Sequence, residues 1–407
     1  MNHMRQFWPV YSALILLAIL FTVVPLKRER AADGTPLGRR TLLYLLRHGG
    51  SAAEQQNRNI QTNGNANAPV ANSAPPATNT PKNANTQPPT SGATSFGVIA
   101  GRNASDDQVL PIIKDLGVQT LRVNYRLGDN QNPDLAKLLA NGFDLVVMFK
   151  NDDPSNSSTT YGTPVQWPSA GFPYVDKARY EQDIQSALRP ILPYLAQGRK
   201  VYAQSENEVS DASVSPKAKY WRGTTQQYLL QLAAFREAVK ALDVRLAVAL
   251  SGFASSGLDA VVGSGASTAD AQKFYGKLLA APEYDVADLH FYGCVGDIAA
   301  KASWVKARLR SGTGWISTEN GGPDYRCAST SATYDQNPTL YLQTEAQQVP
   351  ERLSACSSNG GSVCLWLSLF DMPNEASVFT HMGLLTATTP PQQKLAYGAF
   401  RQFVASQ

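Results

Sequence analysis

The chain has 407 residues and a formal net charge of +4 at neutral pH. Hydrophobic residues make up 43% of it and charged residues 17%, which is enough apolar material for one large domain or two ordinary ones. Much of the positive charge near the start lies at Lys27, Arg28, Arg30, Arg39 and Arg40, before the part with a globular pattern. The sequence therefore lacks the basic face typical of nucleic-acid binding, and we expect no nucleic-acid partner.

The first 30 residues contain an uncharged apolar run from Phe7 to Leu26. A helix of this length would cross about 30 Å of hydrocarbon. No Ala-x-Ala cleavage site follows the run, so residues 1–30 are predicted to be a membrane anchor or an uncleaved signal.

The charges that flank this run conflict with export. Only Arg5 and the amino terminus are positive before it, whereas Lys27, Arg28 and Arg30 follow it. The positive-inside rule would hold the downstream part in the cytoplasm. The composition of the next segment, the cysteines and the enzyme class argued below favour export. We therefore expect a catalytic domain that is anchored outside the cytoplasm, in the periplasm or at the cell surface, or one that is secreted.

Residues 31–95 form a low-complexity segment, and from about residue 51 they are mainly Asn, Ala, Pro, Thr and Gln. Such a segment buries too little apolar surface to offset the entropy of ordering it. It is predicted to be a disordered linker that holds the following domain away from a surface. The alternative is that this low-complexity segment has no function of its own.

The chain has four cysteines, all after residue 290, with no Cys-x-x-Cys pair, and it has only four histidines. This pattern argues against a zinc site, and we expect no metal or other cofactor. An even number of cysteines in an exported protein indicates disulfides. Cys356 and Cys364 would close a small loop, and Cys294 would then pair with Cys327. The alternative is four unpaired small apolar side chains.

From residue 96 to 407, short apolar runs alternate with longer amphipathic ones. The predicted strands lie in FGVIAGR (96–102), QTLRVNYRL (119–127), FDLVVMFKN (143–151), KVYAQSENEVS (200–210), VRLAVALSG (244–252), YDVADLHFYG (284–293), GWISTENGG (314–322) and SVCLWLSLFD (362–371). The predicted helices span 106–117, 132–142, 177–196, 226–243, 270–281, 297–310, 340–356 and 393–406. Strands that alternate with helices predict a parallel sheet.

Eight such units predict a closed (β/α)8 TIM barrel over 96–407. A doubly wound open sheet is the competing fold. It usually has a Gly-rich dinucleotide-binding turn after the first strand, and the turn here reads GRNASDD. The sequence therefore favours the barrel.

Active sites of such barrels lie at the carboxyl ends of the strands. The fourth predicted strand ends with Glu208 and the seventh with Glu319, so the two carboxylates should face each other across the barrel mouth. Cleavage of a glycosidic bond needs such a pair, because one group protonates the leaving oxygen while the other attacks the anomeric carbon.

Several strand-end residues together match a known family. The barrel resembles glycoside hydrolase clan A, closest to the family 5 and family 39 type, and the resemblance covers essentially all of 96–407. The matching residues are Arg122 in strand two, Asn207-Glu208 in strand four, His290 and Tyr292 in strand six, Glu319 in strand seven and Trp366 in strand eight.

The resemblance implies a retaining enzyme with Glu208 as acid/base and Glu319 as nucleophile. It implies that Asn207 bonds the sugar 2-hydroxyl and that the substrate is a β-linked polysaccharide or oligosaccharide.

The resemblance also gives roles to four residues around the pair. Tyr292 would bond and tune the nucleophile, Arg122 would hold it ionised, and His290 would support the acid/base. Trp366 would be the platform on which an apolar sugar face stacks, with a place in the core as the alternative for a Trp in an apolar strand.

The sequence departs from the common pattern in two places. Val209 stands where many family members have Pro after Asn-Glu. Glu206 is a second carboxylate two residues before Glu208, and strand alternation would put both on the same side. Glu206 would then raise the pKa of Glu208, bind a sugar hydroxyl, or serve as the acid itself.

Other functions remain open from the sequence. A transglycosylase would use the same residues, and a non-catalytic glycan-binding barrel would suit the anchor and linker. The two carboxylates could instead have a structural role, in ion pairs with buried arginines. An aldolase is disfavoured because Lys150 is the single candidate for a Schiff-base position. Oligomeric state, sugar and linkage are not encoded in any pattern that we can interpret.

Overall fold

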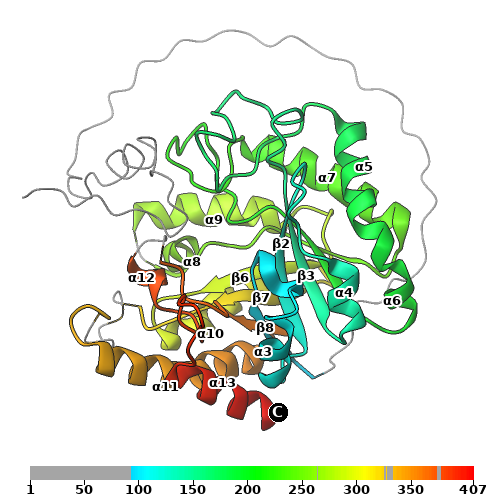
Figure 1. Ribbon diagram of the computed structural model, residues 1–407. Coiled ribbons are helices and arrows are strands. Elements are labelled where there is room, and N and C mark those ends of the chain that lie inside the picture. Colours follow the sequence, from blue (N-terminus) through cyan, green and yellow to red (C-terminus); the bar gives the residue numbers. More distant parts are fainter. Residues whose placement is uncertain (1–92, 264, 325–326, 328–332, 374–376) are drawn as a thin grey trace, which may run out of the picture. The chain divides into compact units, whose positions relative to one another are not determined.

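The computed structural model describes residues 93–407, apart from 264, 325–326, 328–332 and 374–376. Eight parallel strands close into a barrel in the order β1 to β8, because β1 pairs with both β2 and β8 (Figure 1). This confirms the predicted TIM barrel. The strands are β1 (Ser95–Ile99), β2 (Thr120–Arg126), β3 (Asp144–Lys150), β4 (Val201–Ser205), β5 (Ala247–Ala249), β6 (Val286–Phe291), β7 (Gly314–Asn320) and β8 (Val363–Trp366).

Helices follow every strand and surround the barrel (Figure 1). The α-helices are α3 (Leu110–Asp115), α4 (Leu135–Ala140), α5 (Lys177–Leu188), α6 (Leu192–Ala196), α7 (Thr225–Leu242), α8 (Ser255–Val262), α9 (Ala266–Leu279), α10 (Ile298–Lys306), α11 (Pro338–Ser358), α12 (Ser377–Thr380) and α13 (Leu395–Ala405). Short 3-10 segments are η1 (Arg102–Ser105), η2 (Arg189–Ile191) and η3 (Val295–Asp297).

Two features of the helical layer differ from the expectation. The predicted helix 177–196 is divided into α5, η2 and α6, because Pro190 and Pro193 have no backbone N–H for a continuous ladder. The sequence pattern also missed α8, which lies between β5 and α9. The start of α7 has a capping box between Thr224 and Gln227, which satisfies two backbone N–H groups at this end of the helix.

Side-chain alternation along the strands creates two apolar layers. Val146 of β3 points into the barrel, where it packs with residues such as Tyr202 and Ile316. Its neighbours Leu145 and Val147 point outward, into the larger cluster between the barrel and the helices. The barrel interior is therefore filled by side chains.

The last helix, α13, closes the barrel next to its first units. It packs against α11, and Phe403 contacts Phe96 of β1 edge to face at 5.0 Å between ring centroids. The hydroxyl of Tyr397 donates to Asp115 at the end of α3 over 2.7 Å. These contacts tie the carboxyl-terminal helix to the first strand and the first helix.

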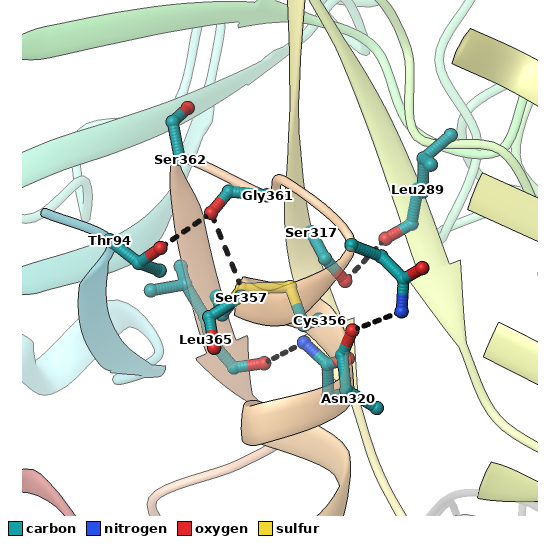
Figure 2. Close-up of a disulfide and its surroundings, with 12 residues drawn as sticks. Thr94, Leu289, Ser317, Asn320, Cys356, Ser357, Gly361, Ser362 and Leu365 are labelled. Carbon is teal, nitrogen blue, oxygen red and sulfur yellow. Dashed lines mark hydrogen bonds between the residues drawn. A yellow bond between two sulfur atoms is a disulfide. The ribbon is translucent and has the colours of Figure 1, made fainter. Parts of the chain in front are cut away.

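The structure contains the two disulfides that we expected, Cys294–Cys327 and Cys356–Cys364. Figure 2 shows that the second joins the end of α11 to β8. Beside it, the Thr94 hydroxyl donates to the carbonyl of Gly361 at 2.9 Å, which attaches the start of the barrel to the same loop. The bridge therefore lies at the amino-terminal end of the barrel, opposite the expected site.

The predicted membrane anchor (1–30) and almost all of the predicted linker (31–95) lie outside the described residues. Within the residues that are described, no helix is both long enough and apolar enough to cross a membrane.

Candidate active site

A pocket of about 640 Å³ opens at the carboxyl ends of the barrel strands. Glu208 and Glu319 both line it, and so do Arg122, Asn207 and Tyr292. The structure thus brings together five of the seven predicted site residues in one cavity.

Glu319 enters the pocket because β7 contains a register shift. Asp288 of β6 pairs with Ile316 of β7, and His290 of β6 pairs with Glu319 of β7. Two residues along β6 therefore correspond to three residues along β7, so β7 holds one extra residue here. The pairing with β8 shifts in the same stretch. A bulge of this kind re-aims side chains, and here it turns Glu319 toward His290 and the pocket.

Two donors hold the carboxylate of Glu319. The Arg122 guanidinium donates to Oε1 through Nη1, and the Tyr292 hydroxyl donates to Oε2 at 2.6 Å. Burial alone would raise the pKa of Glu319. The positive charges of His290 and Arg122, together with the Tyr292 hydroxyl, outweigh that effect and lower the pKa below its usual value. Glu319 is therefore ionised at neutral pH, as a nucleophile requires.

Arg122 also positions the amide that precedes the second carboxylate. Its Nη2 donates to Oδ1 of Asn207 at 2.6 Å, and its side chain is almost fully buried. One guanidinium thus links the end of β7 with the turn after β4. Because Oδ1 of Asn207 accepts from Arg122, its Nδ2 is the amide atom that can donate to a ligand.

Glu208 follows β4 in a turn rather than in the strand. Its φ of 40° lies in the left-handed region, which is unusual for a residue with a side chain. The next backbone N–H, that of Val209, donates to the Ser251 hydroxyl at 3.1 Å and fixes the turn. Oε1 of Glu208 lies 2.8 Å from Nδ1 of His290.

His290 lies beneath the two carboxylates and is fully buried. Its Nδ1 is also 3.3 Å from Oε2 of Glu319, and its Nε2 is 3.3 Å from Oδ2 of Asp288. Burial would lower the pKa of His290, but the carboxylates of Glu319 and Asp288 raise it to about 10. The ring is therefore an imidazolium at neutral pH, and both of its N–H groups donate.

Asp288 is a site residue that sequence reasoning missed. It is fully buried on β6, and its Oδ2 accepts from Gln204 at 2.7 Å and from the Thr318 hydroxyl at 2.6 Å. The signal in the sequence was its spacing, because a residue two before His290 on a strand faces the same side.

One atom from each of Glu208, His290 and Glu319 lies within 4.8 Å of the others, and these residue types are common metal ligands. Among the described residues, however, this group is already paired internally and with Arg122. A protonated imidazole has no lone pair for a metal ion. The arrangement fits a carboxylate pair around a buried cation better than a metal site.

Glu206 does not share the pocket with Glu208, so the expectation that both lie on one side is wrong. β4 ends at Ser205, and Glu206 has a φ of 62°, which breaks the strand alternation. Its Oε1 accepts from the backbone N–H of Asn151 at 3.0 Å and from Gln231 of α7 at 2.8 Å. Burial raises the pKa of Glu206 to about 8, so this carboxyl is mainly neutral at neutral pH.

Trp366 is not the open sugar platform that we expected. Its side chain is fully buried, and its indole N–H donates to the backbone carbonyl of Met382 at 2.9 Å. With its N–H hydrogen-bonded, the indole of Trp366 packs as part of the core. The aromatic rings that line the pocket are instead Tyr220, Tyr292 and Phe379.

No protein-family model matches the chain, and no curated protein matches it in sequence. Solved structures that are similar to it in fold include a glucosidase and a glucanase. A glucosidase from Croceicoccus marinus is 14% identical, with a TM-score of 0.51 over 77% of this chain and 66% of that chain. An endo-β1,6-glucanase is 12% identical, with a TM-score of 0.52 over 79% of this chain and 78% of that chain. At these identities the likeness concerns the fold, which is the barrel that the resemblance to clan A implied.

Proposed function

We propose that this chain is a retaining glycoside hydrolase that cleaves β-linked sugars, with Glu319 as nucleophile and Glu208 as acid/base. One observation carries the proposal. Carboxylate oxygens of Glu208 and Glu319 lie within 4.8 Å of each other at the mouth of one pocket. Retaining enzymes have their carboxyl groups about 5 Å apart, whereas inverting enzymes need more room for a water molecule.

In the first step, Glu319 attacks the anomeric carbon and forms a glycosyl ester, while Glu208 gives its proton to the departing oxygen. Ionised Glu319 is ready to attack because Arg122 and Tyr292 stabilise its charge. In the second step, Glu208 takes a proton from water, and the resulting hydroxide equivalent breaks the ester. Glu319 returns as a carboxylate and Glu208 as an acid.

Asn207 and His290 are positioning groups in this scheme. The Nδ2 of Asn207 donates to the 2-hydroxyl of the sugar, because Arg122 occupies Oδ1. His290 orients Glu208 through the 2.8 Å contact with Oε1, and its charge favours the ionised form of Glu319.

The test is hydrolysis of aryl β-glycosides and polysaccharides by the full chain, with the anomeric product followed by proton NMR. We expect the β-anomer to form first. Glu319→Gln should abolish turnover, and Glu206→Gln is the matched control because this carboxylate lies outside the pocket. Release of the α-anomer first, or full activity of Glu319→Gln, would contradict the proposal.

Azide rescue assigns the two roles separately. With Glu208→Ala, azide should restore turnover of a glycoside with a good leaving group and give the β-glycosyl azide. With Glu319→Ala, azide should give the α-glycosyl azide, because it attacks in place of the missing nucleophile. The reverse pattern would exchange the two roles. New glycosides formed with an added acceptor sugar would identify transfer beside hydrolysis.

We also propose that residues 7–26 anchor the protein, and that residues 31–95 tether the catalytic domain on the extracytoplasmic side. The apolar sequence of the first segment and the two disulfides of the domain support this arrangement. Protease added to intact cells, or to cells with a permeabilised outer membrane, should release the domain. Protection until the inner membrane is broken would contradict it.

A further inference from the structure

The charged side chains that line the pocket are unequal in sign. Among the described residues, the acidic ones in the lining are Glu208 and Glu319, the pair assigned to the chemistry. The basic ones are Arg102, Arg122, Arg126, Lys150 and Lys219. Arg122 is bound to Glu319 and Asn207, so four basic side chains have no part in the proposed reaction.

These four side chains come from one half of the barrel. Arg102 follows β1, Arg126 and Lys150 end β2 and β3, and Lys219 lies between β4 and α7. The half formed by β5 to β8 contributes small, hydroxyl and apolar side chains instead, such as Ser255, Leu367 and Phe379. The pocket therefore has a basic wall and a neutral wall, with the catalytic pair between them.

Arg126 and Lys150 form the centre of the basic wall. They are partners in the register between β2 and β3, so their side chains leave the barrel next to each other. Both contact the same carboxylate oxygen, Oδ2 of Asp152, with Lys150 at 3.4 Å. Asp152 is buried and does not line the pocket, so it holds the two cations from behind.

The wall carries more positive than negative charge. Besides Asp152, Asp129 lies 3.2 Å from Arg102 and 4.0 Å from Arg126. Arg102, Arg126 and Lys150 thus share these two carboxylates. The Glu206 carboxyl also acts on Lys150, but it is mainly neutral at neutral pH. Burial lowers the pKa of Lys150, and the nearby charge of Arg126 lowers it further despite Asp152. A negative group in the pocket would relieve this repulsion.

We propose that the pocket selects a sugar with an oxyanion substituent, which Arg126 and Lys150 bind as a pair. The substituent is a carboxylate, as in a uronic acid, or a sulfate or phosphate ester. The hydroxyl oxygens of a neutral sugar can accept hydrogen bonds from these cations but do not offset their charge. An oxyanion accepts the same hydrogen bonds and also carries the opposite charge, so it binds the pair more strongly. The inference rests on the proposed function for the identification of the ligand as a carbohydrate.

The experiment measures binding with sugars that resist cleavage. The probes are phenyl 1-thio-β-glycosides of glucose, galactose and mannose, each as the neutral sugar, the 6-carboxylate, the 6-sulfate and the 6-phosphate. Isothermal titration of the unmodified full chain gives Kd for each at low and high salt. We expect an anionic member of at least one series to bind about tenfold or more tightly than its neutral partner, with a preference that falls as salt rises. Comparison among the three substituents identifies which oxyanion is preferred.

Variants locate the effect. Arg126→Gln and Lys150→Gln should each weaken binding of the anionic probe about tenfold, as expected for the loss of a charge-assisted hydrogen bond, and leave the neutral probe unchanged. Arg102→Gln, at a more exposed position, serves if either variant fails to fold. Arg245→Gln is the matched control. It removes an arginine paired with Asp243 just before β5, at the opposite end of the barrel, and should change nothing.

Equal or tighter binding of the neutral member in every series overturns the inference, and so does a failure of every anionic probe to bind. Turnover of O-glycosides separates this result from the proposed function. If hydrolysis depends on Glu319 but no anionic sugar is preferred, the proposed glycosidase activity stands and the proposed selection of an anionic sugar is wrong. If anionic sugars are preferred in binding but no sugar is hydrolysed, the selection of an anionic sugar stands and the proposed glycosidase activity is wrong.

Discussion

Nδ1 of His290, on β6, lies 2.8 Å from Oε1 of Glu208, which stands in the turn after β4. The same nitrogen is 3.3 Å from Glu319, and the other ring nitrogen is 3.3 Å from Asp288. Three carboxylates therefore surround one imidazolium. This cation, with Arg122, allows two acidic groups to lie close together in a largely buried site.

Replacing His290 with Gln should move the acidic limb of kcat/KM to higher pH. The charge of His290 helps to lower the pKa of Glu319, and Glu319 acts as the ionised nucleophile. Without that charge the pKa of Glu319 rises, so protonation removes activity at a higher pH than in the parent. A pH–rate profile measures the shift, and thermal unfolding checks that the variant is folded. An acidic limb at the same pH would mean that His290 does not tune Glu319.

Tyr292→Phe removes the hydroxyl that donates to Oε2 of Glu319 at 2.6 Å and keeps the ring in place. A hydrogen bond to a charged group is worth about 1.5–3 kcal/mol. We therefore expect kcat/KM to fall roughly tenfold to a hundredfold, with little change in Tm. Tyr284→Phe is a useful comparison, because this buried tyrosine lies outside the pocket lining, just before β6, and its hydroxyl donates to the carbonyl of Leu279. If Tyr292→Phe and the parent have equal kcat/KM, the Tyr292 hydroxyl has no role in the mechanism.

The sequence carried enough information for the barrel, because eight apolar runs alternate with eight amphipathic ones. It also located Glu208 and Glu319, because strand ends form the mouth of such a barrel. It was less informative where the backbone leaves strand geometry. The turn after β4 sends Glu206 away from the pocket, and the bulge in β7 decides where Glu319 points. Both depend on contacts between distant strands, which local alternation does not encode.

Two other errors have a different origin. Trp366 was assigned to the sugar because its strand position matches a family pattern, whereas its burial depends on how residues near Met382 fold over it. The basic wall went unnoticed because Arg102, Arg126 and Lys150 are far apart in the sequence and come together only at the mouth of the closed barrel.

Glu206→Gln should reduce the pH dependence of stability between about pH 4.5 and pH 8. Glu206 has a pKa of about 8 in the fold, against a usual value of 4.5. In this window the unfolded chain loses its proton before the folded one, so the parent loses stability as pH rises. Each unit of difference is worth ~1.4 kcal/mol. Gln keeps the acceptor for Asn151 and Gln231 without the titration.

Urea unfolding of the parent and of Glu206→Gln at pH 5 and pH 8 measures this effect. The variant should gain stability relative to the parent as pH rises, and it should retain turnover. A constant difference between the two proteins across this range would show that Glu206 does not titrate there.

Removal of either disulfide should destabilise the domain without changing the pocket. The separations are 8 residues for Cys356–Cys364 and 33 for Cys294–Cys327. Loop-closure entropy predicts losses of roughly 2.5 and 3.7 kcal/mol for the Ala–Ala double variants. Thermal unfolding with and without a reductant provides the measurement. Reductant should lower the Tm of the parent and affect the double variants less, and an unchanged parent Tm would contradict the bridges.

The nucleophile is identified by the mass of the intact protein after reaction with a 2-deoxy-2-fluoro-β-glycosyl fluoride of the preferred sugar. Such a reagent forms the glycosyl ester quickly and releases it slowly. We expect an added mass of one fluorosugar, located by peptide mapping on Glu319 and missing from Glu319→Gln. A turning-over enzyme that gains no mass, or that carries the label on another residue, would contradict the assignment of Glu319 as the nucleophile.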